Sequence, residues 1–177
     1  MREIAQDAEV NFGLIRYHYG DKLGLYRACI EKYGQMRFES AKRFLTPAIS
    51  KDDFTTKLKY AIEDIILNQI TDVDLTRMVL HEIEESGARA DDILGSTLVQ
   101  MAKRFVEFFT EAKKAGYLRK DLDPLLLTYF IQGSINHFVR TDGIRSRHFK
   151  FSVKDEKNRH QLVEHLYQLV LNGCLNQ

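Results

Sequence analysis

Apolar residues recur three or four positions apart along most of the chain. In residues 51–70, for example, Phe54, Leu58, Ile62 and Ile66 fall on one side of a helix with 3.6 residues per turn. The alternation of apolar and polar residues that marks a strand is essentially absent. The pattern therefore predicts an all-α protein, with helices over residues 2–8, 12–19, 22–45, 51–70, 75–85, 92–115, 124–139 and 155–175.

The ends of these helices are predicted from residues that cap or break a helix. Gly20 tolerates the left-handed conformation that ends a helix, and the carboxylate of Asp21 suits the N-cap of the next one. Pro47 follows the end of the long third helix, because proline pushes the residue before it out of helical geometry. Gly116 is expected to cap the 92–115 helix, and Pro124 to occupy the first turn of the helix after it.

The first two predicted helices fit a tight helix–turn–helix. Ala5 and Ile15 face inward, and the small side chain of Ala5 lets the two helices approach closely. Val10 in the turn is expected to fill the space between them, and Asn11 to cap the second helix. In DNA-binding proteins with this geometry the second helix lies in the major groove, and its N-terminal residues meet base edges.

The order of residues in this segment resembles the tetracycline-repressor (TetR) family of transcriptional regulators. The family pattern reads roughly I-A-x-x-A-G-V-S-x-G-x-L-Y-x-H-F-x-x-K-x-x-L. The chain matches it at Ile4, Ala5, Ala8, Val10, Gly13, His18, Tyr19, Lys22 and Leu25. The match covers about residues 2–33, and this ordered combination is more specific than a helix–turn–helix pattern alone. Two departures are Glu9, where the family has glycine, and Arg16, where it has a phosphate-contacting tyrosine.

The resemblance implies that the second helix and the start of the third bind double-stranded operator DNA. Lys22 falls where the family anchors a phosphate, and Arg16 can donate to a phosphate or to guanine. The residues expected at the DNA are Asn11, Phe12, Leu14, Arg16, Tyr17, His18 and Lys22. The alternative is that residues 16–18 form an ordinary solvated helix end, with His18 structural and Lys22 a plain surface lysine.

A change of composition near residues 46–51 suggests two domains. Residues 1–46 are predicted to be the DNA-binding head and its connecting helix, and residues 47–177 an effector-binding and dimerisation domain. The family has a further helix that precedes the motif and braces it, and this helix is not found before Arg2. We therefore expect a truncated chain, a misassigned start or a natural variant, and weak DNA binding by the 177-residue form.

The second domain is expected to hold a small organic effector, because aromatic, methionine and polar residues share neighbouring helices. The expected pocket residues are Met78, His81, Phe105, Phe108, Phe109, Tyr129, Gln132 and Asn136. Such a stripe also suits a solid core. His81 and Glu85 share a helix face, but the remaining spacing does not suit a metal site, so neither metal nor cofactor is predicted.

The last two helices are expected to pair with those of a second copy about a two-fold axis, as the family does. The residues expected at this homodimer interface are Leu125, Tyr129, Phe138, Leu162, Leu166, Leu169, Val170 and Cys174. Two-fold symmetry in the protein implies a roughly palindromic operator.

Charge and cysteine content add little to this interpretation. The net charge is +1, and residues 1–50 carry eight Lys and Arg against six Asp and Glu. The basic residues Arg145, Arg147 and Lys150 fall in residues 141–154, which are expected to form a solvated loop. The two distant cysteines predict no disulfide, and the lack of a signal peptide or a membrane-length apolar run predicts a cytoplasmic protein.

The leading hypothesis is a homodimeric repressor that a small-molecule effector releases from its operator. The third predicted helix joins the head to the body and would transmit the change. No P-loop, nucleophile elbow, zinc-protease motif or dinucleotide fingerprint occurs in the chain, so an enzyme is not predicted. The alternative function is a ligand-binding or interaction module that has lost DNA binding with the missing helix.

Overall fold

The computed structural model describes residues 1–86 and 88–174, and every regular element within these residues is an α-helix. This confirms the predicted all-α class. In chain order the elements are α1 (Arg2–Asp7), α2 (Phe12–Tyr19), α3 (Lys22–Phe44), α4 (Lys51–Thr71), α5 (Val73–Glu84), α6 (Asp91–Ser96), α7 (Leu98–Lys114), α8 (Pro124–Arg140), α9 (Asp142–Phe149) and α10 (Glu156–Cys174).

Short polar side chains fix where several of these helices begin. Asn11, Asp21 and Asp123 each accept hydrogen bonds from backbone N–H groups in the first turn of α2, α3 and α8, as the sequence predicted for Asn11 and Asp21. Ser50 and Asp72 do the same for α4 and α5. These N–H groups have no partner inside the helix, so each cap contributes about 1 kcal/mol to its helix.

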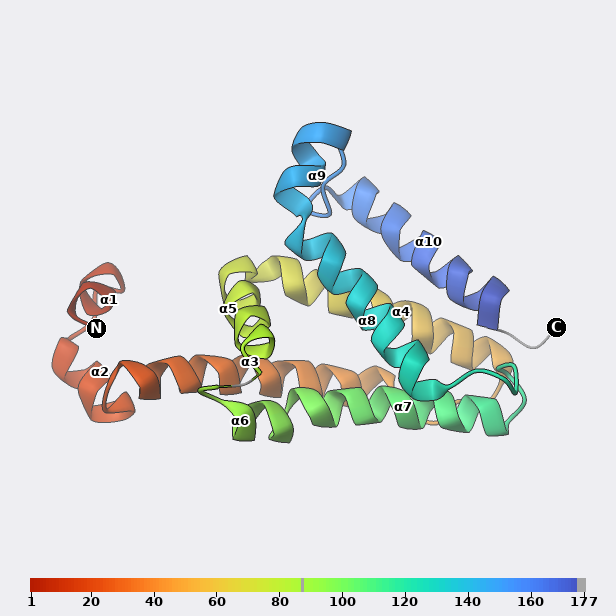
Figure 1. Ribbon diagram of the computed structural model, residues 1–177, viewed down its shortest axis with the longest axis horizontal. Coiled ribbons are helices and arrows are strands. Elements are labelled where there is room, and N and C mark those ends of the chain that lie inside the picture. Colours follow the sequence, from red (N-terminus) through yellow and green to blue (C-terminus); the bar gives the residue numbers. More distant parts are fainter. Residues whose placement is uncertain (87, 175–177) are drawn as a thin grey trace.

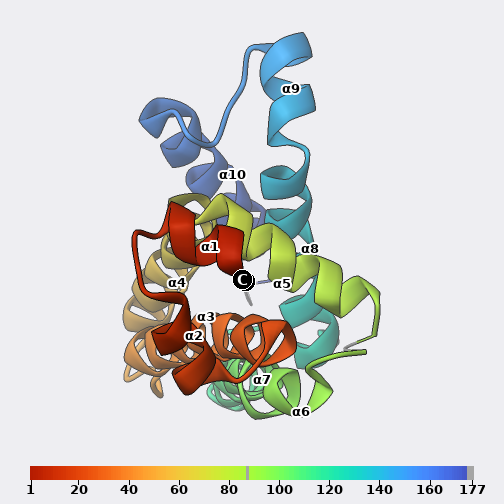
Figure 2. The same ribbon diagram turned by 90° about the vertical axis from the view of Figure 1, so that its left-hand side faces the viewer.

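The long helix α3 is the axis of the molecule (Figure 1). The helices α1 and α2 lie at its N-terminal end, beyond the rest of the chain, while α7 runs along it and α4 runs back beside it. End-on, α8, α9 and α10 rise from one side of this layer (Figure 2). Although the predicted division assigns α3 to the head, this helix packs against α4, α5, α6 and α7.

Two apolar clusters hold the body together. The larger one joins α4, α7, α8 and α10 around fully buried side chains that include Phe54, Ile62, Phe109 and Ile135. The smaller one packs α3 against α5 and α6. By contrast, α1 and α2 bury only Ala5 and Ile15, so little apolar area stabilises the head.

The predicted single helix over residues 92–115 is wrong, because the structure divides it into α6 and α7 at Thr97. Thr97 is buried and has backbone angles of φ −122° and ψ −78°, and its hydroxyl donates to the carbonyl oxygen of Ile93. The break presses this side chain onto Gly34 in the middle of α3. A Cβ added at Gly34 would stand 2.5 Å from the Cβ of Thr97.

We expect Gly34→Ala to lower the free energy of unfolding by about 1–2 kcal/mol, although alanine is the better helix former. The added methyl group has no room, because Thr97 is itself buried. Urea unfolding measures the effect. Gly133→Ala on α8 is the matched control, since nothing lies within 4 Å of its added Cβ and we expect a small gain. An equal gain in both variants would contradict the close contact.

The predicted loop over residues 141–154 is also corrected, because residues 142–149 form α9. Arg145, expected to be solvated, lies between the rings of Phe138 and Phe151, with its Cζ 4.7 and 5.5 Å from their centroids. It also pairs with Asp142 at 2.9 Å, and Asp142 in turn accepts from the backbone N–H of Val153. These contacts order the turn between α8 and α10.

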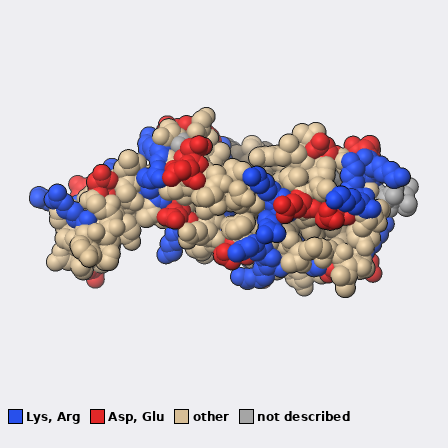
Figure 3. Space-filling view, turned by 90° about the horizontal axis from the view of Figure 1, so that it is seen from below, with Lys and Arg blue, Asp and Glu red and all other residues tan. Residues whose placement is uncertain are grey.

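Charged side chains of both signs are interspersed on the face that α3 and α7 present (Figure 3). Basic side chains mark the tip of the head on this face, but no broad region of one sign covers it. Among the described residues, no helix combines the length and the apolar character needed to cross a membrane.

Candidate functional site

The turn between α1 and α2 is closed by backbone hydrogen bonds. The N–H of Val10 donates to the carbonyl oxygen of Ala5, and the N–H of Glu9 to that of Gln6, the pattern of a Schellman motif. Glu9 has a φ of 54°, in the left-handed region that favours glycine. This is the position at which the family pattern has glycine, so the chain holds a strained residue at the centre of the turn.

We expect Glu9→Gly to stabilise the head by about 0.5–1 kcal/mol, because glycine adopts this φ without the steric cost that other residues bear. Hydrogen-exchange protection of the Ala5 and Ile15 amides measures the effect locally. Glu9→Ala is the control, since it removes the same carboxylate but keeps a Cβ at positive φ. If both substitutions raised protection equally, charge and not backbone strain would be the cause.

The structure leaves most of the predicted DNA-contacting side chains exposed. Tyr17 is 83% exposed, and Asn11, Leu14, Arg16, His18 and Lys22 are exposed as well. Phe12 differs, because it is half-buried beneath Arg2, whose Cζ lies 5.6 Å from the centroid of the ring. Asn11 is occupied as the cap of α2, with its side-chain oxygen 2.7 Å from the N–H of Gly13.

The predicted plug between the two helices is only partly in place. Val10 is exposed in the structure, and so are Ile4 on α1 and Leu23 at the start of α3. All three side chains belong to the head, whose small core leaves them uncovered.

A cavity of about 470 Å³ opens between α3, α4, α5, α6, α7 and α8. Its size falls within the range of small-molecule sites. Its walls are mainly apolar, with Tyr33, Ile65, Val79, Leu80, Ile83, Leu94, Leu98, Val99, Met101 and Ala102. Its polar wall residues are Arg37, Gln69, Ser86, Asp91, Tyr129, Gln132 and Asn136, and Gly133 completes the lining.

The predicted pocket residues separate into three groups. Tyr129, Gln132 and Asn136 on α8 all line the cavity. Phe105, Phe108 and Phe109 on α7 are buried and belong to the larger apolar cluster, because the cavity is lined by the first turns of α7, from Leu98 to Ala102, and the phenylalanines lie further along the helix. Met78 packs on the smaller cluster, and His81 is exposed beside Glu85.

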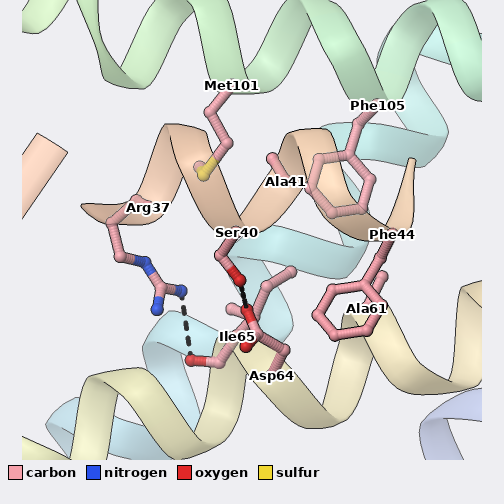
Figure 4. Close-up of a pocket in the computed structure, with 9 residues that line it drawn as sticks. All are labelled: Arg37, Ser40, Ala41, Phe44, Ala61, Asp64, Ile65, Met101 and Phe105. Atoms are coloured by element: carbon pink, nitrogen blue, oxygen red, sulfur yellow. Dashed lines mark hydrogen bonds between the residues drawn. The ribbon is translucent and has the colours of Figure 1, made fainter. Parts of the chain in front are cut away.

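Sequence reasoning missed most of the cavity lining, including the buried charge of Arg37. Arg37 is only 5% exposed, and its Nη2 donates to the carbonyl oxygen of Ile65 at 3.2 Å (Figure 4). Nearby Asp64 is turned to Ser40, whose hydroxyl donates to it, and it also accepts from Asn68 at 2.8 Å. Burial lowers the pKa of Arg37, although the charges of Tyr33 and Asp64 act in the other direction.

A second buried charge lies next to the cavity on α5. Glu82 is 0% exposed and accepts from the hydroxyl of Tyr26 and from the backbone N–H of Arg89, both at 2.6 Å. Burial acts to raise the pKa of Glu82, but these hydrogen bonds and the Arg89 charge hold it below its ordinary value. Beside them, Arg27 pairs with Asp92 at 2.6 Å. These contacts bind the head-proximal part of α3 to α5 and α6.

The predicted dimer residues also divide. Leu125, Tyr129 and Leu169 are exposed, whereas Leu162, Leu166 and Val170 are buried in the chain's own core. Phe138 is half-buried against the same core, and the side chain of Cys174 lies outside the described residues. The buried side of α10 is thus used to cover α4, and the most exposed apolar side chains of α8 are Leu126, at 70%, and Phe130, at 65%.

No group of three or more His, Cys, Asp or Glu side chains within the described residues is arranged to hold a metal ion. His81 and Glu85 come within 3.8 Å on one face of α5 as an isolated pair.

A scan against protein-family models finds no match to the chain, and a search of curated proteins finds no relative.

Proposed function

We propose that the chain is a dimeric DNA-binding transcriptional regulator, a repressor that a small organic effector releases from a roughly palindromic operator. One observation carries the proposal. The single helix α3 begins at Lys22, next to the exposed side chains of α2, and reaches Tyr33 and Arg37 in the cavity wall. A DNA-binding element and an effector site would thus share one rigid element.

The head supports the DNA-binding part of the proposal. A helix that is capped by Asn11, that packs on α1 through Ala5 and Ile15, and that leaves Arg16 and Tyr17 in solvent suits insertion into a major groove. The exposed apolar side chains of Ile4, Val10 and Leu23 suit cover by a bracing helix, as the resemblance implies.

Contacts between α3 and the cavity wall support the coupling. Glu82, which binds Tyr26, is flanked on α5 by the cavity residue Ile83, and Asp92, which binds Arg27, follows the cavity residue Asp91. An effector that moved α5 or α6 would therefore change the position of α3. Two heads moved in this way would no longer fit successive major grooves.

The test is binding to DNA from upstream of its own gene across a salt series, for the 177-residue chain and for a form extended upstream. We expect the extended form to bind and its affinity to fall steeply with salt. Lys22→Ala should weaken binding and reduce the salt slope by about one ion. The control is Lys154→Ala, an exposed lysine in the turn between α9 and α10, two helices that lie away from the head in Figure 1. Lack of DNA binding by both forms without effector would overturn the proposal.

For the dimer, we expect Leu126→Asp with Phe130→Asp to convert a species of twice 20.6 kDa into one of 20.6 kDa. A carboxylate in the core of an interface costs far more than the exposed apolar side chain it replaces. Sedimentation velocity measures the mass. Ile49→Asp is the matched control, because Ile49 is exposed but lies in the turn before α4. A monomeric unsubstituted chain would contradict this part of the proposal.

A further inference from the structure

We infer that the 470 Å³ cavity binds a small organic anion, a carboxylate carried on an apolar body, and that Arg37 holds the carboxylate. The inference rests on the proposed function, because it assigns this cavity as the effector site, and it adds the chemical class of the effector.

Arg37 is a buried cation that has no ion-pair partner within the described residues. Its Nη1 also has no hydrogen-bond partner there. Asp64 contributes a longer-range attraction, but its carboxylate is engaged by Ser40 and Asn68 (Figure 4). Buried charges are normally paired and hydrogen-bonded, since an isolated one is costly. The Arg37 guanidinium therefore lies at the cavity wall as a positive charge without a paired anion in the described part of the chain.

Further buried polar atoms without a hydrogen-bond partner belong to residues of the same cavity wall. Gln132 has a buried Nε2 without a partner, and Gln69 has a buried Oε1 without one, while its Nε2 donates to Asn136 at 2.7 Å. Arg37 and Gln132 would donate to a carboxylate. A hydroxyl or amide N–H on the ligand would satisfy Gln69. Three of the four side chains found with such unsatisfied buried atoms thus belong to one cavity wall.

The rest of the cavity wall is mainly apolar. Val79, Leu80 and Ile83 on α5 and Leu98 and Val99 on α7 surround the space beyond these polar groups. Such a wall suits an aliphatic or aromatic body. Asp91, the acidic residue of the lining, is exposed, so solvent screens it from a bound anion.

The test is isothermal titration, without DNA, of octanoate and 2-naphthoate against 1-octanol and octylammonium. A charge-assisted hydrogen bond contributes about 1.5–3 kcal/mol, so we expect octanoate to bind at least about tenfold more tightly than 1-octanol. Octylammonium should bind more weakly than 1-octanol. In Arg37→Met the preference for the acid should vanish while 1-octanol still binds. Arg43→Met, an exposed arginine on the same helix, should keep the preference.

Gln132→Leu provides an independent variant if Arg37→Met does not fold. It should weaken octanoate several-fold and leave 1-octanol unchanged. The inference is overturned if neither acid binds, if the alcohol and the ammonium bind as tightly as the acid, or if Arg37→Met keeps the preference. Failure of DNA binding with an intact, Arg37-dependent acid preference would instead remove the regulator and leave the anion site.

Discussion

Replacement of Glu82 by alanine is expected to lower the free energy of unfolding by about 3–5 kcal/mol. The substitution leaves the Tyr26 hydroxyl and the Arg89 N–H without their buried acceptor, and it opens a space where the side chain was fully buried. Urea unfolding followed by circular dichroism measures the loss. Glu85→Ala is the matched control, because Glu85 is an exposed carboxylate at the C-cap of the same helix and also pairs with Arg89.

The same carboxylate makes stability depend on pH. The pKa of Glu82 in the folded chain lies below its ordinary value. Its contribution is therefore complete above the unfolded pKa of about 4.3 and is lost as the pH falls through the folded pKa. Glu82→Gln keeps the shape of the side chain but cannot ionise. The variant should therefore lose less stability than the unsubstituted chain as the pH falls from about 5 to about 3. Parallel acid dependence in both proteins would count against this assignment.

Replacement of Arg37 by methionine is expected to raise the stability of the unliganded chain by about 1–3 kcal/mol. Methionine fills similar space, and it removes a buried charge that forms no ion pair within the described residues. The measurement is the midpoint and slope of urea unfolding. Together with the lost preference for octanoate, a gain would mean that Arg37 trades stability for ligand binding.

Arg43→Met separates this effect from the general loss of a positive charge on α3. Arg43 is exposed, so its replacement should change stability by no more than about 0.5 kcal/mol. A destabilised Arg37→Met variant would indicate that the bond to Ile65 and the packing on Tyr33 outweigh the cost of burying the charge.

Local sequence signals were sufficient for most helix limits. Asn11 and Asp21 act as the predicted caps, Pro124 occupies the first turn of α8, and Gly20 and Gly116 have positive φ where helices end. The break at Thr97 escaped prediction because its cause is a tertiary contact with Gly34, over sixty residues away in sequence. The helix α9 escaped for a related reason, since its polar residues are ordered by contacts of Arg145 and Asp142 with α8 and the turn before α10.

The cavity shows where the limits of sequence reasoning lie. Periodicity places Phe108 and Phe109 on an apolar side of α7, but it does not indicate which neighbour that side meets. A usable signal for Arg37 was present. Ile30, Tyr33 and Ala41 are spaced so that Arg37 falls within their buried stripe. On α5, Glu82 likewise falls within the buried stripe, three residues after Val79. A charged residue inside an apolar stripe was therefore the sign of a functional or strongly paired group.

The contact between Gly34 and Thr97 also defines a fulcrum. Twelve residues of α3 precede Gly34, beginning at Lys22, and form an arm of about 18 Å at 1.5 Å per residue. Tilting this arm by about 10° around the contact would carry its tip through about 3 Å, nearly the ~3.4 Å spacing of base pairs. The close fit at Gly34 hinders sliding and rolling of the two helices. Under the proposed function, this contact would convert a small shift of the cavity wall into a larger displacement of the head.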